Sequence, residues 1–292
     1  MKSMSGFGGG VASLGMRGIS DPGYTDWGGG LPVWDKTSST VYTINSPSYS
    51  GLDISIHYGM TTDSFNRYLI FTNRFGGTSD YTIWVPITDT GAPDFNARFG
   101  VLPPNYNYFG ALADTVRGRI YHCEYSNGNL VGQDLPSTLS GLSAGNYASI
   151  SGNTKYTLAA ENAPNLTWPG TSAVDGGYHD GWNDIYYFVG RNNTSLFSYN
   201  PNTSSWTNHG SGSGWNAKYG ICKDPSSNYF IYSRRDVGWE MFNGVNGSNI
   251  TTYASGFTSF PNNAEDSIIA WNGDVYTWYA GSSTCNRWTR TA

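Results

Sequence analysis

Residues 185–199 read IYYFVGRNNTSLFSY, and this stretch decides the fold of the chain. Two runs of aromatic, aliphatic and small polar residues, 185–189 and 195–199, flank a short segment of Gly, Arg, Asn and Thr. Aromatic and β-branched side chains fit a pleated strand, while Gly and Asn favour the tight turn between two strands. The stretch therefore predicts a β-hairpin.

Similar hairpins recur along the chain at a nearly constant interval. They begin near Val33, Leu69, Tyr108, Tyr147, Tyr186, Tyr229 and Val275. The successive intervals are 36, 39, 39, 39, 43 and 46 residues. A period of about 40 residues that contains only strands is typical of a propeller blade, whose sheet buries its faces against neighbouring blades. The predicted fold class is all-β, a β-propeller of six or seven four-stranded blades.

The composition suits one large β domain preceded by an arm. Of the 292 residues, 16% are aromatic and 13% are charged, against about a quarter charged in an average domain. Residues 1–30 differ from the rest because they contain GFGGG at 6–10 and GGG at 28–30 and few large apolar side chains. Such a segment cannot build a core of its own. We expect a Gly-rich N-terminal arm over residues 1–30 and a propeller over residues 31–292.

The arm is expected to lie extended against a partner, because its backbone groups need hydrogen-bond partners outside the segment. The partner is another subunit of a larger assembly or the chain's own propeller. The candidate anchoring side chains are Phe7, Val11, Leu14, Met16 and Ile19.

Charge and hydropathy exclude several classes of partner. The formal net charge is −5, and the closest approach to a basic cluster, Arg234-Arg235, is offset by Asp236. Binding to duplex nucleic acid needs clustered Lys and Arg, so no nucleic-acid partner is expected. No stretch approaches the run of about 20 apolar residues that spans a bilayer. The apolar stretch at 11–16 is too short and Gly-broken for a signal-peptide core, so no export signal is recognised.

The three cysteines and four histidines do not form a metal-binding pattern. Cys123, Cys222 and Cys285 lie far apart, and the histidines show no zinc-ligand spacing. We expect buried free thiols, although one disulfide stays open as an alternative. Asp180 and Asp184 lack the spacing of a calcium loop and are expected to form a turn. Neither a metal nor a cofactor is predicted.

The segment from Tyr199 to Trp206, YNPNTSSW, resembles the kelch repeat. In that repeat the third strand ends in Tyr-Asp-Pro, passes a polar turn and enters the fourth strand at a Trp. The resemblance is good in this blade and partial around residues 71–84. It implies a kelch-like propeller in which Tyr199 and Trp206 pack between blades.

A second resemblance concerns the whole chain. The Gly-Phe-Gly-Gly-Gly leader followed by Gly- and aromatic-rich strands is similar in style to small structural proteins of tailed, particularly marine, bacteriophages. It implies a non-enzymatic virion protein at the tail, neck or capsid surface that serves structural attachment, host-surface glycan binding, or both. A virion protein is assembled in the host cytoplasm and reaches the outside without a signal peptide. A secreted propeller lectin or adhesin is the alternative from a different class.

A glycosidase is the third alternative. Trp182-Asn183-Asp184 and the downstream Arg235-Asp236 resemble two motifs of the invertase-type five-bladed glycosidases, but the first motif stands too late in the chain and both motif prolines are missing. A retaining site also needs two carboxylates about 5 Å apart. We expect Asp180, Asp184, Asp236 and Glu240 not to converge on one pocket.

Recognition is the function that remains. Aromatic planes cover the C–H faces of sugars, while nearby amides and carboxylates bind the hydroxyls. The candidate glycan-binding aromatics are Trp27, Tyr106, Trp168, Trp182, Trp215 and Trp239.

The last hairpin reaches almost to residue 292 and leaves its blade without an outermost strand. A strand from residues 31–60 is expected to complete this blade and close the ring.

Overall fold

A computed structural model of the chain describes residues 34–44, 57–73, 82–101, 108–124, 130–135, 165–170, 173–190, 195–211, 217–223, 229–234, 238–243, 250–251, 266–279 and 282–290. Over these ranges the chain is all-β, with one short 3₁₀ helix, η2 (Phe95–Ala97). The all-β prediction is confirmed.

The strands form five small antiparallel sheets, numbered here as blades in chain order. Blade 1 contains β2 (His57–Thr62), β3 (Tyr68–Asn73), β4 (Thr82–Pro86) and β5 (Phe99–Val101). Blade 2 contains β6 (Tyr108–Asp114), β7 (Arg119–Glu124) and β8 (Leu130–Asp134). Blade 3 contains β9 (Val174–Asp180), β10 (Ile185–Gly190), β11 (Ser195–Asn200) and β12 (Ser205–Ser211).

Blade 4 contains β13 (Ala217–Lys223), β14 (Tyr229–Arg234), β15 (Gly238–Asn243) and β16 (Ile250–Thr251). Blade 5 contains β17 (Asp266–Ile269), β18 (Val275–Trp278), β19 (Thr284–Arg290) and, as its outer strand, β1 (Trp34–Thr43). In blade 2 an isolated bridge between Leu130 and Leu166 continues the sheet beyond β8.

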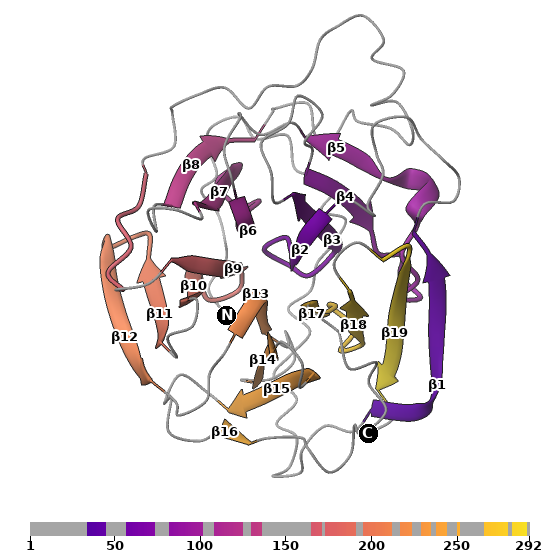
Figure 1. Cartoon of the computed structure of the whole chain (residues 1–292). Coiled ribbons are helices and arrows are strands. Elements are labelled where there is room, and N and C mark those ends of the chain that lie inside the picture. The colour runs from indigo at the N-terminus through magenta and orange to yellow at the C-terminus, as the bar shows by residue number, and fades with distance from the viewer. Residues whose placement is uncertain are drawn as a thin grey trace, which may run out of the picture.

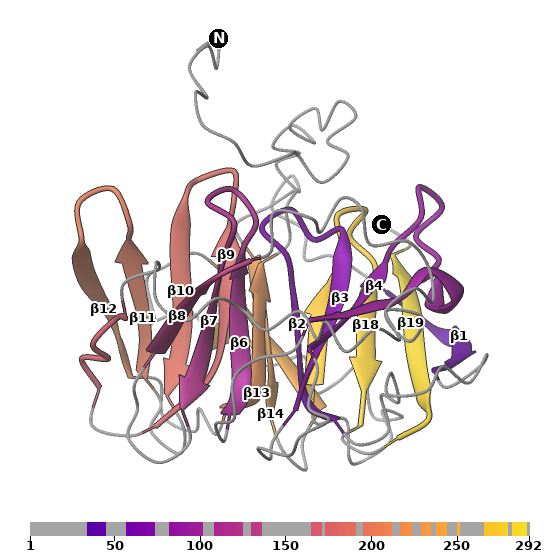
Figure 2. The same cartoon turned by 90° about the horizontal axis from the view of Figure 1, so that it is seen from above.

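The five blades surround one axis, as Figure 1 shows, and Figure 2 shows them from the side. Their first strands contact one another in the order β2, β6, β9, β13 and β17, and β17 also contacts β2. The described residues therefore form five blades where the sequence predicts six or seven. The hairpin expected at Val33 supplies only β1, and the one expected at Tyr147 lies outside the described residues.

The expected closure by an N-terminal strand is confirmed. β1 pairs antiparallel with β19, with Thr40 opposite Arg287 and Thr43 opposite Thr284. Trp288, which an open edge would expose, is 4% exposed, and its indole N–H donates to Thr277 Oγ1 at 3.0 Å. Blade 5 thus joins residues 34–43 to residues 266–290 in one sheet.

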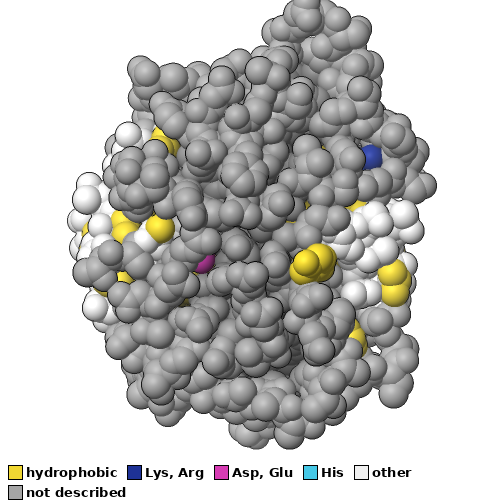
Figure 3. Space-filling model, viewed as in Figure 1, with side chains coloured by type: hydrophobic (Ala, Val, Ile, Leu, Met, Phe, Trp, Pro, Cys, Tyr) yellow, Lys and Arg dark blue, Asp and Glu magenta, His cyan; other side chains and the backbone are white. Residues whose placement is uncertain are grey.

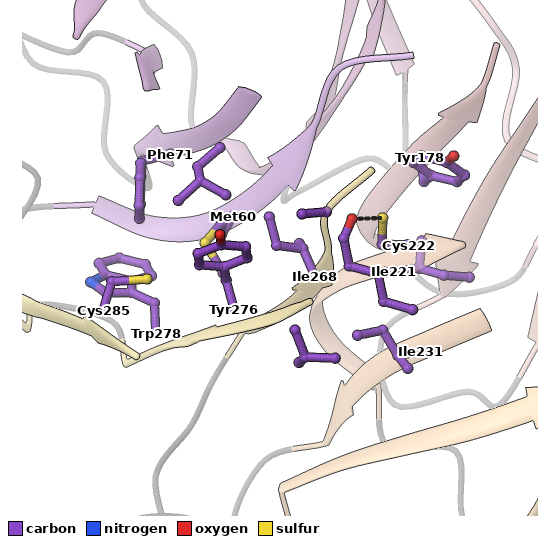
Figure 4. Close-up of a cluster of buried hydrophobic side chains, with 14 of the residues drawn as sticks. Met60, Phe71, Tyr178, Ile221, Cys222, Ile231, Ile268, Tyr276, Trp278 and Cys285 are labelled. Carbon is purple, nitrogen blue, oxygen red and sulfur yellow. Dashed lines mark hydrogen bonds between the residues drawn. The ribbon is translucent and has the colours of Figure 1, made fainter. Parts of the chain in front are cut away.

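The core lies between the blades. The largest buried cluster contains Met60 and Phe71 of blade 1, Tyr178 of blade 3, Ile221 of blade 4 and Trp278 of blade 5, among others (Figure 4). Phe71 meets Trp278 edge to face, with ring centroids 5.2 Å apart. Inner strands are buried at consecutive positions, as in β10 from Tyr186 to Gly190 and β18 from Val275 to Trp278. Both faces of these strands are therefore covered, because neighbouring blades bury the faces that a lone sheet would leave in water.

The segment from Tyr199 to Trp206 forms a tight turn between two strands, as the sequence predicts. β11 ends at Asn200 and β12 begins at Ser205, and the rings of Tyr199 and Trp206 lie 4.9 Å apart. Both side chains pack against a cluster that includes Leu112 and Tyr121 of blade 2. The predicted packing of this Tyr/Trp pair between blades is confirmed.

The three cysteines are free and buried, which confirms the prediction. Burial raises the pKa of the Cys285 thiol far above its ordinary value, because a thiolate would lose its hydration. Cys123 is affected in the same direction, by burial and by the nearby Asp175.

Candidate functional site

In three blades an Asp at the end of the first strand, or directly after it, organises the following turn. Asp63 accepts the backbone N–H groups of Phe65, Arg67 and Tyr68, at 3.3, 2.6 and 3.1 Å. Asp114 and Asp180 accept N–H groups of their own turns in the same way. These Asx-type bonds satisfy turn amides that no strand partner reaches. The recurring Asp is therefore used for the turn, and its oxygens are occupied.

The β2–β3 turn of blade 1 crosses the end of the axis and contacts each of the other four blades. Ser64 accepts from Thr115 N of blade 2 at 2.8 Å, and Ser64 O accepts from Gly181 N of blade 3 at 2.8 Å. The Asn66 amide donates to Lys223 O of blade 4 at 2.9 Å and to Ile269 O of blade 5 at 2.7 Å. This turn, residues 63–67, is called the axial turn below.

Blades 2 and 3 are joined by a charged cluster in which His179 and Asp114 are buried and Arg117 and Asp184 are partly exposed. His179, fully buried, has its Nδ1 3.2 Å from Asp114 Oδ1 and its Nε2 3.2 Å from Asp184 Oδ1. Arg117 donates to both oxygens of Asp184 at 2.6 Å and to Asp114 Oδ2 at 3.1 Å. Tyr186 also donates to Asp114. The cluster pairs two carboxylates with two bases, and its charges cancel when His179 is protonated.

The pKa values follow from this arrangement. Burial alone lowers the pKa of His179, but the carboxylates of Asp114 and Asp184 raise it above its ordinary value. Burial opposes ionisation of the two carboxylates, yet their bonds to His179 and Arg117 hold both carboxyl pKa values well below the usual range. The side-chain bond to Asp184 raises the pKa of Arg117. The raised pKa of His179 and the lowered carboxyl pKa values both favour the ionised form of the network.

One contact resembles a catalytic serine–histidine pair. Ser64 Oγ lies 2.7 Å from His179 Nδ1, and Asp184 Oδ1 lies 3.2 Å from the other ring nitrogen, Nε2. The serine is fully buried, accepts from Thr115 N and lies 3.3 Å from Ala113 O. A nucleophile must reach its substrate, and a buried hydroxyl cannot. The contacts of Ser64 instead hold the axial turn in place.

Asp180 makes a second ionic contact, between blades 3 and 4. Lys223 Nζ lies 2.7 Å from Asp180 Oδ2, and the side chains are 6% and 1% exposed. The remaining Asp180 oxygen accepts the turn amides of Trp182 and Asn183. The sequence prediction that Asp180 forms a turn is confirmed.

The carboxylates considered for a glycosidase are used in different contacts where they are described. Asp180 pairs with Lys223, whereas Asp184 pairs with Arg117 and His179. Asp236 lies outside the described residues, and Glu240 is placed in β15 without a described side chain. Asp114, which the sequence analysis did not single out, is the second carboxylate beside His179.

The predicted glycan-binding aromatics fall into three groups. Trp168 is buried, with its ring 4.8 Å from Phe197 and 5.9 Å from Trp206. Trp182 is partly exposed in the β9–β10 turn. Trp239 lies in β15 without a described side chain, and the others lie outside the described residues: Trp27, Tyr106 and Trp215. The arm residues Phe7, Val11, Leu14, Met16 and Ile19 also lie outside them.

Trp182 lies among other aromatic and Arg side chains of the turns. It meets Phe65 of the axial turn edge to face at 5.2 Å, and Arg67 of the same turn lies over the ring of Trp271 at 4.2 Å. Phe65, Arg67 and Trp271 were missed in the sequence analysis. All three are aromatic or Arg residues in the turn after the first strand of a blade, and this pattern could have identified them from the sequence.

Within the described ranges, no group of three or more His, Cys, Asp or Glu side chains is arranged to hold a metal ion. In the same part of the chain, no helix has the length and apolar character needed to cross a membrane.

No protein-family model and no curated protein matches the chain. Among solved structures, a chain of the crystal structure of a nidogen/laminin complex aligns with 82% of this chain and 80% of its own, at 11% identity and a TM-score of 0.47. Hydrazine synthase of Kuenenia stuttgartiensis aligns with 77% of this chain and 56% of its own, at 9% identity and a TM-score of 0.43.

Proposed function

We propose that the protein is a non-enzymatic recognition and attachment component of a virion, of the kind found at the tail, neck or capsid surface of tailed bacteriophages. The observation that carries the non-enzymatic part is the pairing of the buried charges. Asp114, Asp180 and Asp184 all hold turns and neighbouring blades together. Catalytic carboxylates instead need an open cleft, and the one that acts as general acid needs a proton to donate.

A propeller of this kind offers rigid turns from several blades at one end of its axis. Recognition by such a surface needs partly exposed aromatic side chains and polar neighbours, which Trp182 and the exposed Asn183 supply. Composition supports the virion setting, since 16% of the residues are aromatic and only 13% are charged. Figure 3 shows few charged side chains among the described residues of one face.

The secreted-lectin alternative is less well supported. A propeller lectin repeats one sugar site in each blade, and the feature that recurs in blades 1, 2 and 3 is the Asp at the end of the first strand or directly after it. Its oxygens accept hydrogen bonds from turn amides in blades 1, 2 and 3.

We also propose that the propeller is kelch-like, because the rings of Tyr199 and Trp206 pack against each other.

The attachment role is tested in particles. Particles are grown with wild-type protein, with residues 2–20 deleted, or with Phe7, Val11 and Leu14 replaced by Ser. A matched variant replaces Ser3, Ser5 and Ser13 by Ala. We expect the deletion and the Ser replacements to abolish incorporation, measured by mass spectrometry of purified particles, while the matched variant incorporates normally. Incorporation of the deleted form at the wild-type level would overturn the anchoring role.

The absence of catalysis is tested separately. Purified protein is incubated with a panel of bacterial polysaccharides, and new reducing ends are measured. We expect none above the buffer control. Release that disappears in Asp184→Asn while the variant remains folded would replace this proposal with the glycosidase.

A further inference from the structure

Four partly exposed side chains in the turns of three blades form two contacting pairs, Trp182 with Phe65 and Arg67 with Trp271, and the four are called the axial strip. Trp182 contacts Phe65 at 5.2 Å with nearly perpendicular rings, and Arg67 Cζ lies 4.2 Å above the ring of Trp271. Phe65 and Arg67 belong to one turn, so the two contacts join three blades.

The strip is held by backbone bonds. Gly181 N donates to Ser64 O at 2.8 Å, and Trp271 N donates to Asn66 O at 3.1 Å. A Cβ on Gly181 would lie 2.7 Å from Ser64 O and 2.9 Å from Phe65 Cε1, so only glycine allows the two turns to approach this closely. The strip is therefore in place before a ligand arrives, which lowers the entropy lost on binding.

Two hydrogen-bond donors of the strip are unused within the described part of the chain. Arg67 Nε and Trp271 Nε1 are both buried and have no hydrogen-bond partner there. The only ion pair of Arg67 described is between Nη1 and Asp89 Oδ1, at 3.6 Å, and the Asp89 side chain is 96% exposed. A pair with this geometry contributes little, so an acceptor with better geometry can displace Asp89.

We propose that the axial strip binds a carboxylate-bearing sugar, such as a uronic or sialic acid residue of a surface polysaccharide. The sugar ring covers Trp182 and Phe65, while its carboxylate replaces Asp89 and accepts hydrogen bonds from the guanidinium of Arg67. This inference deepens the proposed function and rests on its glycan-binding part. Asp63 is the other carboxyl near Arg67, and its oxygens accept turn amides.

The test uses acidic and neutral probes of matched size. Trigalacturonic acid and sialyllactose are titrated calorimetrically into the full chain, alongside galactotriose and lactose. We expect an acidic probe to bind at least tenfold more tightly than its neutral counterpart. We expect Arg67→Gln to remove that preference and Trp182→Ala to weaken binding of both kinds at least tenfold. Arg119→Gln, another partly exposed Arg near a carboxylate at 3.8 Å, is the matched control and should bind like wild type.

Circular dichroism and thermal unfolding establish that each variant is folded. If neither acidic probe binds, or if Arg67→Gln keeps the preference, the strip proposal is overturned. A glycan array run in parallel separates the two proposals. Array binding that survives Arg67→Gln and Trp182→Ala disproves the strip but leaves glycan recognition standing, whereas an array without binding removes the glycan-binding function itself.

Discussion

His179 lies between two carboxylates with no exposure to solvent, and its charge is the centre of the contact between blades 2 and 3. A buried ion is tolerated only when partners replace its hydration. Here Asp114 and Asp184 do so for His179, and Arg117 balances the second negative charge. Removing any one member leaves an uncompensated charge at the interface.

Asp184→Asn is predicted to destabilise the fold by about 2 kcal/mol, because it leaves Arg117 and His179 with one carboxylate between them. Asn tolerates the left-handed backbone of this position, where φ is 57°, so the change isolates the charge. Chemical denaturation measures the loss. Asp134→Asn, which removes the 3.8 Å partner of Arg119, should change stability by less than about 0.5 kcal/mol. Equal effects of the two changes would contradict this view of the cluster.

The cluster also predicts a pH dependence. The pKa of His179 is raised in the folded protein above the ordinary value near 6.5, so the imidazolium contributes stability that is fully present below about pH 6.5. That contribution is lost as pH rises through the folded pKa. We expect the free energy of unfolding to fall as the pH rises above about 6.5. In His179→Gln this part of the profile should be flat, and an unchanged slope would rule out His179 as its source.

Asn66 combines a left-handed backbone, with φ of 56°, and an amide that donates to two blades. Asn66→Gly and Asn66→Ala both remove the amide, but only Ala is strained at this φ. We predict that Ala is less stable than Gly by about 1 kcal/mol, and that both are less stable than wild type. Thermal unfolding of the three proteins is the measurement. Identical stability of the Gly and Ala forms would contradict this prediction, because it would show that the backbone at residue 66 changes conformation to avoid the strain.

The residues of the site were predictable only in part. Asp180 and Asp184 were expected to form a turn, because Asp favours turns after a strand. Their ionic partners come from other blades: Arg117 lies 67 residues before Asp184, and Lys223 lies 43 residues after Asp180. No local pattern encodes such distances, because they depend on how the blades are arranged around the axis.

At the scale of elements, hairpins were the most predictable part. The alternation of aromatic and β-branched residues predicted that β3 pairs with β4 and that β10 pairs with β11. In the observed registers, Leu69 lies opposite Val85 and Phe188 lies opposite Phe197. The segment near Val33 was less predictable, because its strand character gives no indication of which strand it pairs with. It belongs to blade 5, and the described blades number five rather than six or seven.

Disrupting β1 is predicted to expose Cys285, which lies opposite Tyr42 in the register. Val41 is 59% exposed, so Val41→Pro damages the strand with little loss of packing, whereas Val41→Thr preserves it. A thiol reagent followed by peptide mass spectrometry should label Cys285 at least tenfold faster in Val41→Pro than in Val41→Thr. Cys123 and Cys222 are the internal controls and should stay protected. Uniform labelling of all three would indicate global unfolding instead.

At the scale of the whole molecule, the axial turn and the ion pairs connect blades that share no sheet. Ser64 and Asn66 bond to blades 2, 4 and 5, and Asp180 bonds to Lys223 across blades 3 and 4. The blades are therefore expected to unfold together. Urea titrations followed by tryptophan fluorescence and by far-ultraviolet circular dichroism should give coincident midpoints. Midpoints separated by more than about 0.5 M would show that blades unfold independently.

The pairing of β1 with β19 sets an order of events during synthesis. Residues 34–43 leave the ribosome long before their partner, residues 284–290, is made. Blades 1 to 4 have all their described strands before that point, but β1 must wait unpaired while more than two hundred further residues are added. An unpaired strand attracts other chains, so crowded polysomes are where this protein is most exposed to mispairing. Translation rate and chaperone supply, more than the equilibrium strength of any contact, then govern how much protein completes its ring.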